Sequence, residues 1–263
     1  MSRTAEQLRL RNSPLVRVLA QVRISAILKM REFVPAVQEA LRHQGYPRFS
    51  EQELLEVQLR PESPPKRREL WRFADRANRE AVVLAQDFIA LETNRYTCFE
   101  EFTERLQQVL EIVGSEIEAK ATIAERLGLR YVDLILPEDG EPLDDYLEQK
   151  LHGLRAKDLG VEKMLNRFEA RGQTRFGQLV VRLHQNEEGA CLPPDLMPSE
   201  LTQARTIDPG RLITLLDIDH FTTQSRDYNA PALIDAMWEL HEYTERAFRS
   251  SVTAHALERW VRE

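Results

Sequence analysis

The stretch RLGLRYVDLILP, residues 126–137, alternates in polarity as a β-strand does and ends at a proline. Side chains two residues apart share a face of a strand, so Tyr131 and Asp133 lie on one face and Arg130 lies on the other. The neighbours of Arg130 on its face are apolar. An arginine in an apolar row requires a carboxylate or a bound anion, and we expect a carboxylate. This strand also begins a second series of elements.

The order of the predicted elements before residue 126 recurs after it. Period-two alternation predicts the strands, and apolar residues at helical spacing predict the helices. The first series is strand, helix, three strands and long helix at 13–25, 34–45, 54–61, 69–75, 80–96 and 99–119. The second has the same order at 126–137, 142–154, 164–172, 177–186, 211–221 and 230–261, with a proline-broken excursion at 189–210. We expect an α+β fold of two β-α-β-β-β-α halves, 1–122 and 123–263, with antiparallel sheets packed on long helices.

An internal duplication would explain the two series, but the sequence leaves this open. Asp87 and Tyr96 in the first half stand at positions like those of Asp219 and Tyr228 in the second, and both segments lead into a long helix. Identity elsewhere between the halves is thin. Joined edge to edge, the halves would form one continuous sheet and remove two exposed edges. We therefore expect a single compact unit.

The composition indicates a globular protein of a reducing compartment. Apolar residues make up 42% of the 263 residues and charged residues 30%, which is typical of folded chains. The sequence has no run of 18 apolar residues and no apolar signal segment near its start. Two cysteines, Cys98 and Cys191, are too few for a disulfide framework or a thiolate zinc site. We expect a cytoplasmic protein with no membrane partner.

Five short motifs are spread along the chain: PLVRVLAQVRI (14–24), Trp71 and Phe73 two residues apart, RLGLRYVD (126–133), LDID (216–219) and F-x-x-x-x-T (248–253). Together they resemble a family that is distributed sporadically among bacteria and archaea and has no assigned activity. The resemblance covers most of the chain, and the middle motif is the most specific. Asp133 stands where the family pattern leads us to expect Asn, so a role that needs a neutral amide would not carry over directly. The patchy distribution implies mobile genes and a setting of anti-phage defence or of a toxin–antitoxin pair.

Two carboxylates interrupt the apolar strand RLITLLDIDHF. Asp217 and Asp219 share a face and lie about 7 Å apart along a strand. Such a pair could hold a hard cation such as Mg²⁺, with Asp133 among the candidates for a third ligand, or divide acid and base roles. The alternative, which we favour, is that the two aspartates pair with arginines across the sheet, such as Arg126 or Arg130.

A basic stretch in the first half is the best candidate for contact with a nucleic acid or another partner. Lys66, Arg67 and Arg68 precede Trp71, and cations beside an aromatic ring suit single-stranded nucleic acid, whose bases stack on rings. Residues 1–79 are also net positive, whereas the remainder is net negative. The alternative, which we favour, is a solvated hairpin tip beside a tryptophan of the core.

Familiar catalytic signatures are absent from the sequence. It contains no HExxH, P-loop, GxGxxG or GxSxG motif, and its six histidines are dispersed. We expect a non-enzymatic protein that acts by binding a protein, a second copy of itself or a nucleic acid, without a cofactor. Two alternatives stay open. One is a Mg²⁺-dependent phosphoesterase or nuclease centred on Asp217 and Asp219, and the other is a small-molecule or nucleotide binder with a cavity between sheet and helices.

Overall fold

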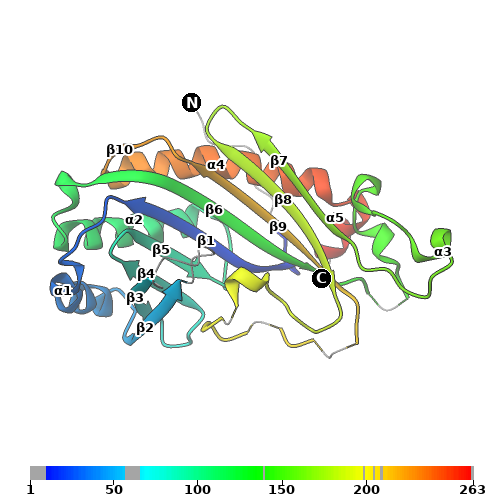
Figure 1. The fold of residues 1–263 in the computed structure, drawn as a ribbon, viewed down its shortest axis with the longest axis horizontal. Coiled ribbons are helices and arrows are strands. Elements are labelled where there is room, and N and C mark those ends of the chain that lie inside the picture. Colours follow the sequence, from blue (N-terminus) through cyan, green and yellow to red (C-terminus); the bar gives the residue numbers. More distant parts are fainter. Residues whose placement is uncertain are drawn as a thin grey trace.

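The computed structural model describes residues 10–56, 66–138, 140–197, 199–203, 205–207 and 210–261, which form one antiparallel sheet with helices on one face (Figure 1). The strands are β1 (Leu15–Ile24), β2 (Arg48–Glu56), β3 (Lys66–Ala74), β4 (Glu80–Ala85), β5 (Phe88–Thr93), β6 (Ile123–Ile135), β7 (Arg167–Gln173), β8 (Gln178–Asn186), β9 (Ile213–Thr222) and β10 (Arg226–Asp227). The α-helices are α1 (Met30–His43), α2 (Phe99–Glu116), α3 (Ala156–Leu159), α4 (Ala230–Ser251) and α5 (Ala254–Val261). Short 3-10 helices are η1 (Ala119–Ala121), η2 (Leu143–Asp145), η3 (Gln149–Leu151) and η4 (Pro194–Leu196). None of the described helices combines the length and apolar character needed to cross a membrane.

The strand order places the two halves side by side. Across the sheet it is β2-β3-β4-β5-β1-β6-β9-β8-β7, and β10 also pairs with β6. The antiparallel neighbours β1 and β6 join the halves. Each is flanked on its outer side by the last long strand of its own half, β5 or β9, from which a meander runs outward. The α+β class and the single continuous sheet are therefore confirmed.

Alternation along the central strands decides which side chains meet the helices. Val18, Ala20 and Val22 of β1 are fully buried, as is Leu129 of β6. They belong to one apolar core with residues of α1, α2 and α4, and Figure 1 shows α2 and α4 lying across the same face of the sheet. A second cluster on the helix side joins α5 and the η2–η3 segment to β8 and β9. The face opposite the helices carries most of the charged side chains of the central strands.

An irregularity at the start of β1 changes the expected alternation. The register of β1 on β6 shifts between Leu15 and Arg17, as a β-bulge does. Regular alternation would place Val16 on the side of Val18, but Val16 packs in a small apolar cluster on the opposite face. Leu15 packs toward the helices and lies opposite Asp133 across the strand pair.

The predicted strand at 80–96 is divided in the structure. It forms β4 and β5, which pair as a hairpin with a turn at residues 86–87. Asp87 therefore lies in a turn, whereas Asp219 lies inside β9, and the expected likeness of their positions is wrong. The predicted strand at 54–61 overlaps the end of β2, and its remainder falls outside the described residues.

Two predicted helices are also divided. The segment 142–154 forms η2 and η3 instead of one helix. The segment 230–261 forms α4 and α5, because Val252 is extended and makes an isolated β-bridge with Leu147. Thr253 then accepts the backbone N–H of Ala256 at 3.1 Å and caps α5.

The predicted excursion between β8 and β9 crosses the sheet face opposite the helices. Leu201 is buried there against Ala74 and Ala81 of the first half. The backbone N–H of Thr202 donates to the carbonyl of Asn78 at 2.8 Å. The excursion therefore ties the second half to the first by polar and apolar contacts.

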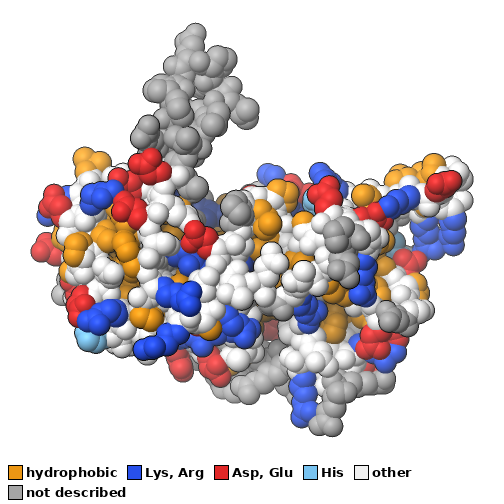
Figure 2. All heavy atoms as spheres, turned by 90° about the horizontal axis from the view of Figure 1, so that it is seen from below, with side chains coloured by type: hydrophobic (Ala, Val, Ile, Leu, Met, Phe, Trp, Pro, Cys, Tyr) orange, Lys and Arg blue, Asp and Glu red, His pale blue; other side chains and the backbone are white. Residues whose placement is uncertain are grey.

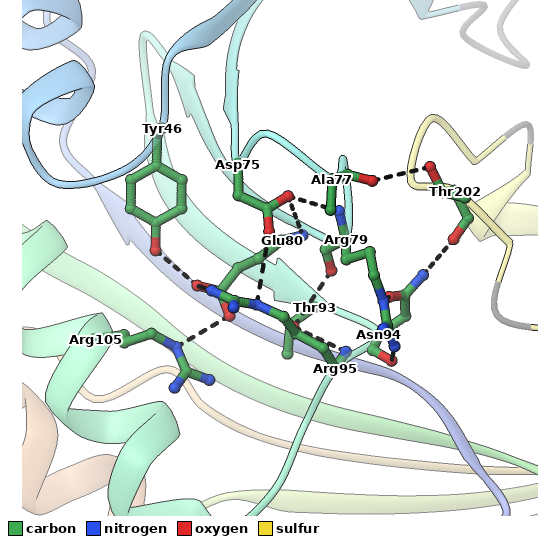
Figure 3. A network of polar contacts seen from close by, with 10 residues as sticks. All are labelled: Tyr46, Asp75, Ala77, Arg79, Glu80, Thr93, Asn94, Arg95, Arg105 and Thr202. Carbon is green, nitrogen blue, oxygen red and sulfur yellow. Dashed lines mark hydrogen bonds and ion pairs between the residues drawn. The ribbon is translucent and has the colours of Figure 1, made fainter.

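A buried carboxylate ties the first meander to the helices (Figure 3). Glu80, at the start of β4, is fully buried and accepts hydrogen bonds from Tyr46 (2.8 Å), Arg95 (3.3 Å) and Arg105 (3.0 Å). Tyr46 follows α1, and Arg105 belongs to α2. Asp75 in turn accepts the backbone N–H of Glu80 at 3.2 Å. A buried charge requires such partners, so these contacts fix the position of β4 against α1 and α2.

Replacing Glu80 with alanine should destabilise the fold, because two arginines and a tyrosine hydroxyl would lose a fully buried partner. We expect the free energy of unfolding, measured by urea denaturation, to fall by about 3 kcal/mol. Glu39→Ala is the control, since Glu39 forms an exposed ion pair with Arg42 within α1 and its loss should change little. Similar, small changes in both variants would contradict the assigned role of Glu80.

Candidate functional site

A cavity of about 370 Å³ lies between the sheet and α4. Four segments that are distant in sequence contribute most of its wall: residues 10–15, 96–98, 131–133 and 241–248. The lining residues are Leu10, Arg11, Ser13, Leu15, Tyr96, Thr97, Cys98, Tyr131, Asp133, Ile218, His241, Thr244, Glu245 and Phe248. The size and the mixture of apolar walls with a few polar groups are typical of small-molecule sites.

Regular backbone positions the polar groups of the cavity. Tyr131 and Asp133 share a face of β6, as the sequence predicts, and the structure places that face on the helix side of the sheet. On α4, His241, Glu245 and Phe248 recur at intervals of four and three residues, which places them along one side of the helix. The side chains that converge on the cavity are therefore held by a strand and a helix that pack on each other.

One wall of the cavity is an aromatic cluster with a neutral polar contact. The Tyr131 hydroxyl lies 3.0 Å from Nδ1 of His241. The ring of Phe99 stacks on the imidazole with centroids 3.9 Å apart, and the Tyr96 ring meets Tyr131 edge to face at 5.8 Å. Burial lowers the pKa of His241 to about 3 and raises the pKa of Tyr131. Both groups are thus uncharged near neutral pH, and packing fixes their orientation.

Asp133 is the unusual group of the cavity. The residue is only 4% exposed, yet no hydrogen bond or ion pair joins its side chain to any residue that the structure describes. Burial, and secondarily the charge of Asp217, raises the pKa of Asp133 to about 8. The carboxyl is therefore mostly protonated at pH 7. Its oxygens are not among the fully enclosed side-chain atoms that lack a partner, so the carboxyl faces the open space of the cavity, where solvent or a ligand can complete its hydrogen bonds.

Arg130 and Asp217 form a two-pronged ion pair on the opposite face of the sheet. The Nε and Nη2 atoms of Arg130 donate to Asp217 at 2.7 and 2.8 Å. Asp195 of η4 accepts from the same guanidinium, at 2.5 and 3.1 Å, and Arg182 lies 3.3 Å from Asp217. Both groups of the main pair are buried or nearly so. The expected pairing of Arg130 with a carboxylate is confirmed.

Asp219 lies on the same face but makes no direct hydrogen bond or ion pair with any described residue. It is the cross-strand partner of Arg130. Burial raises the pKa of Asp219, and the charges of Arg126 and Arg130 partly offset this effect. The expected pairing of this aspartate with an arginine is thus electrostatic only.

The structure separates the residues that the Mg²⁺ alternative would bring together. Asp133 points to the helix side, whereas Asp217 and Asp219 point to the opposite face. Asp133 cannot complete a ligand set with them, and that part of the expectation is wrong. Within the described ranges, no group of three His, Cys, Asp or Glu side chains could hold a metal ion.

The basic stretch does not present its tryptophan to a partner. Trp71 is 1% exposed and belongs to the core beneath the helices, so its ring cannot stack on a base, and the expectation of contact is wrong for this residue. Arg68 donates to Asp87 at 2.8 Å. Lys66 and Arg67 begin β3, but their side chains lie outside the described part of the chain. The alternative of a core tryptophan is confirmed.

Sequence reasoning missed the α4 side of the cavity. His241, Thr244 and Glu245 are polar, yet they lie on the stripe of α4 that includes the buried Met237 and the cavity-lining Phe248. Polar residues on the apolar stripe of an amphipathic helix are the signal that could have found them.

Comparisons with protein-family models, with curated proteins and with solved structures found no match to this chain. The site is therefore defined by its own geometry. That geometry combines a protonated carboxyl, which can both donate and accept a hydrogen bond, with aromatic and aliphatic walls. It is suited to enclose a compact molecule that carries one polar or charged group.

The raised pKa of Asp133 should make the free energy of unfolding depend on pH. Asp133 ionises near pH 4 when unfolded and near pH 8 when folded, so folding requires a proton between these values. The free energy of unfolding should therefore fall as pH rises from 5 to 8, by up to about 1.4 kcal/mol per pH unit relative to Asp133→Asn. Urea denaturation of both proteins between pH 5 and 9 measures this difference. Parallel curves for the two proteins would contradict the raised pKa.

Proposed function

We propose that this protein binds a small molecule in the cavity between the sheet and α4. The observation that carries the proposal is Asp133, a buried carboxyl that lines the cavity without a partner among the described residues. A ligand with a complementary polar group would complete the hydrogen bonds of that carboxyl. The cavity volume of about 370 Å³ falls within the range of ligand sites. The aromatic wall would bury the body of the ligand.

Filling the cavity should abolish binding without unfolding the protein. Leu15 lines the cavity at the β1 bulge, and Leu15→Trp would occupy part of its volume. We expect a fragment library of mixed charge, observed by saturation-transfer NMR, to give ligands that bind the wild type and not Leu15→Trp. Leu28→Trp is the control, because Leu28 is 86% exposed and its replacement should leave binding unchanged.

Circular dichroism must show that both variants are folded. A library without any ligand for the wild type would contradict the proposal. Ligands that bind Leu15→Trp as well as they bind the wild type would contradict it too.

A second candidate function is self-association through β7, in keeping with the expected binding to a partner or a second copy. β7 is an edge strand, and all its residues are exposed. In an antiparallel pair of two β7 strands centred on Ala170, Glu169 of one copy would face Arg171 of the other. Opposite charges directly across a strand pair stabilise it. Exposed Leu165 and Phe168 nearby would add apolar contact.

Charge reversal tests this pairing. We expect Glu169→Arg to dissociate a dimer, because the introduced guanidinium would face Arg171 of the other copy, and the double variant E169R/R171E to restore it by exchanging the charges. Light scattering after size-exclusion chromatography over a range of protein concentrations gives the mass. A wild type that stays monomeric, or a double variant that associates no better than the single one, would contradict association through β7.

Nucleic-acid binding is the less favoured form of a partner function. The buried ring of Trp71 removes the stacking platform on which it was based. On the molecular face seen in Figure 2, a row of Lys and Arg side chains at the lower left has Asp and Glu side chains beside and below it. Neighbouring acidic side chains offset the positive field on which nucleic-acid binding depends. A setting in phage defence or in a toxin–antitoxin pair stays a prediction.

We also infer that the halves arose by duplication. The inference is supported by the strand order, in which each half places its first strand beside its last long strand and runs its meander outward. A long helix follows the last long strand in both halves, α2 after β5 and α4 after β9 and β10.

We infer a cytoplasmic location as well. Cys98 and Cys191 are both free thiols, and free thiols persist in a reducing compartment.

A further inference from the structure

The geometry points to an organic amine, bound as its ammonium cation, as the ligand of the cavity. This inference rests on the proposed small-molecule function. The charge of the ligand follows from the carboxyls that line the cavity. Asp133 and Glu245 both contribute to its wall. Glu245 is already committed to Arg249, one turn further along α4, at 2.8 Å. Asp133 has no such partner among the described residues and is the carboxyl left to receive a cation.

The aromatic wall favours a cation as well. The rings of Tyr96, Tyr131 and Phe248 line the cavity, and the faces of aromatic rings attract ammonium groups. The imidazole of His241 is neutral and in contact with Tyr131, so it brings no competing positive charge. Arg11 belongs to an exposed stretch of the lining segment 10–15. The buried part of the cavity thus combines an uncommitted carboxyl with electron-rich rings.

The remaining wall of the cavity indicates that the non-charged part of the amine is apolar and compact. Leu10, Leu15 and Ile218 supply apolar surface beside the rings. A fully hydrophilic cation such as a short polyamine would leave this surface without contact. An amine with one compact apolar body, attached by a short linker, would place its ammonium at Asp133 and its body against the apolar wall.

Binding of such a cation should be coupled to a proton. The titratable and charged groups around Asp133 are Asp217 from β9, His241 and Glu245 from α4, Tyr131 from its own strand, and Tyr96, Cys98 and Arg11 from the other walls. An adjacent ammonium favours the ionised form of a carboxyl. Because burial keeps Asp133 mostly protonated at pH 7 in the free protein, the carboxyl should lose its proton when the ammonium enters.

The test compares 2-phenylethylamine with 2-phenylethanol, which has the same body and no charge. Isothermal titration calorimetry of the full chain at pH 7 should show the amine binding at least tenfold more tightly than the alcohol. Affinity for the amine should rise between pH 6 and 8. Titrations in buffers of different ionisation enthalpy should show release of close to one proton per amine bound.

Two neutralising variants separate the site from general electrostatics. Asp133→Asn should weaken amine binding at least tenfold, abolish proton release and leave binding of the alcohol nearly unchanged. Asp219→Asn is the matched control. Asp219 is also a substantially buried carboxyl without a direct partner among the described residues, but it lies on the opposite face of the sheet, and its replacement should not alter amine binding.

Three results would overturn the inference. Equal affinity for amine and alcohol would remove the role of charge while leaving the small-molecule proposal intact. Unchanged amine binding by Asp133→Asn would place the cation elsewhere. Absence of binding by both probes would exclude this class of ligand, whereas the small-molecule proposal would still be decided by the fragment library and the Leu15→Trp variant.

Discussion

The antiparallel pairing of β1 with β6 is the constraint on which the rest of the structure depends. It joins the two meanders into one sheet, and the period of two along β6 then assigns every polar residue to a face. Arg130 falls on the open face and is neutralised by Asp217. Asp133 falls on the helix side, opposite the bulge of β1 at Leu15. A change of register by one residue would exchange these faces and bury the arginine beneath α4.

The buried carboxyl groups of Glu80 and Asp133 differ in whether the fold supplies partners for them. Glu80 is fully buried, but a tyrosine and two arginines bind it (Figure 3), so its burial helps to fix helices against strands. Asp133 is almost as deeply buried and has no partner among the described residues. Stability alone would favour an amide or an aliphatic side chain there. Local departures from what stability requires are expected where a protein binds or reacts, and for this reason we propose the cavity, and not the arginine pair, as the functional site.

Alternation in the sequence was sufficient to predict much of the sheet, including the opposite faces of Arg130 and Asp133 and the pairing of Arg130 with a carboxylate. Alternation failed at Val16, because a bulge depends on how two strands meet. The helical spacing of apolar residues failed at 142–154, which forms two 3-10 helices instead of one α-helix. The cavity could not be predicted, because its walls come from segments that only tertiary packing brings together. One signal was present in the sequence: the polar residues His241 and Glu245 lie on the otherwise apolar stripe of α4, which could have indicated the cavity.

The pKa of Asp133 decides whether the cavity holds a carboxyl without a partner. Carbon-detected NMR of the aspartate carboxyl groups during a pH titration gives it, and Asp133→Asn assigns the signal. We predict that the Asp133 carboxyl in the free protein titrates near pH 8, because burial disfavours its ionised form. Titration below pH 5, as in ordinary aspartates, would mean that the carboxyl is solvated or paired and would contradict the proposed role of Asp133.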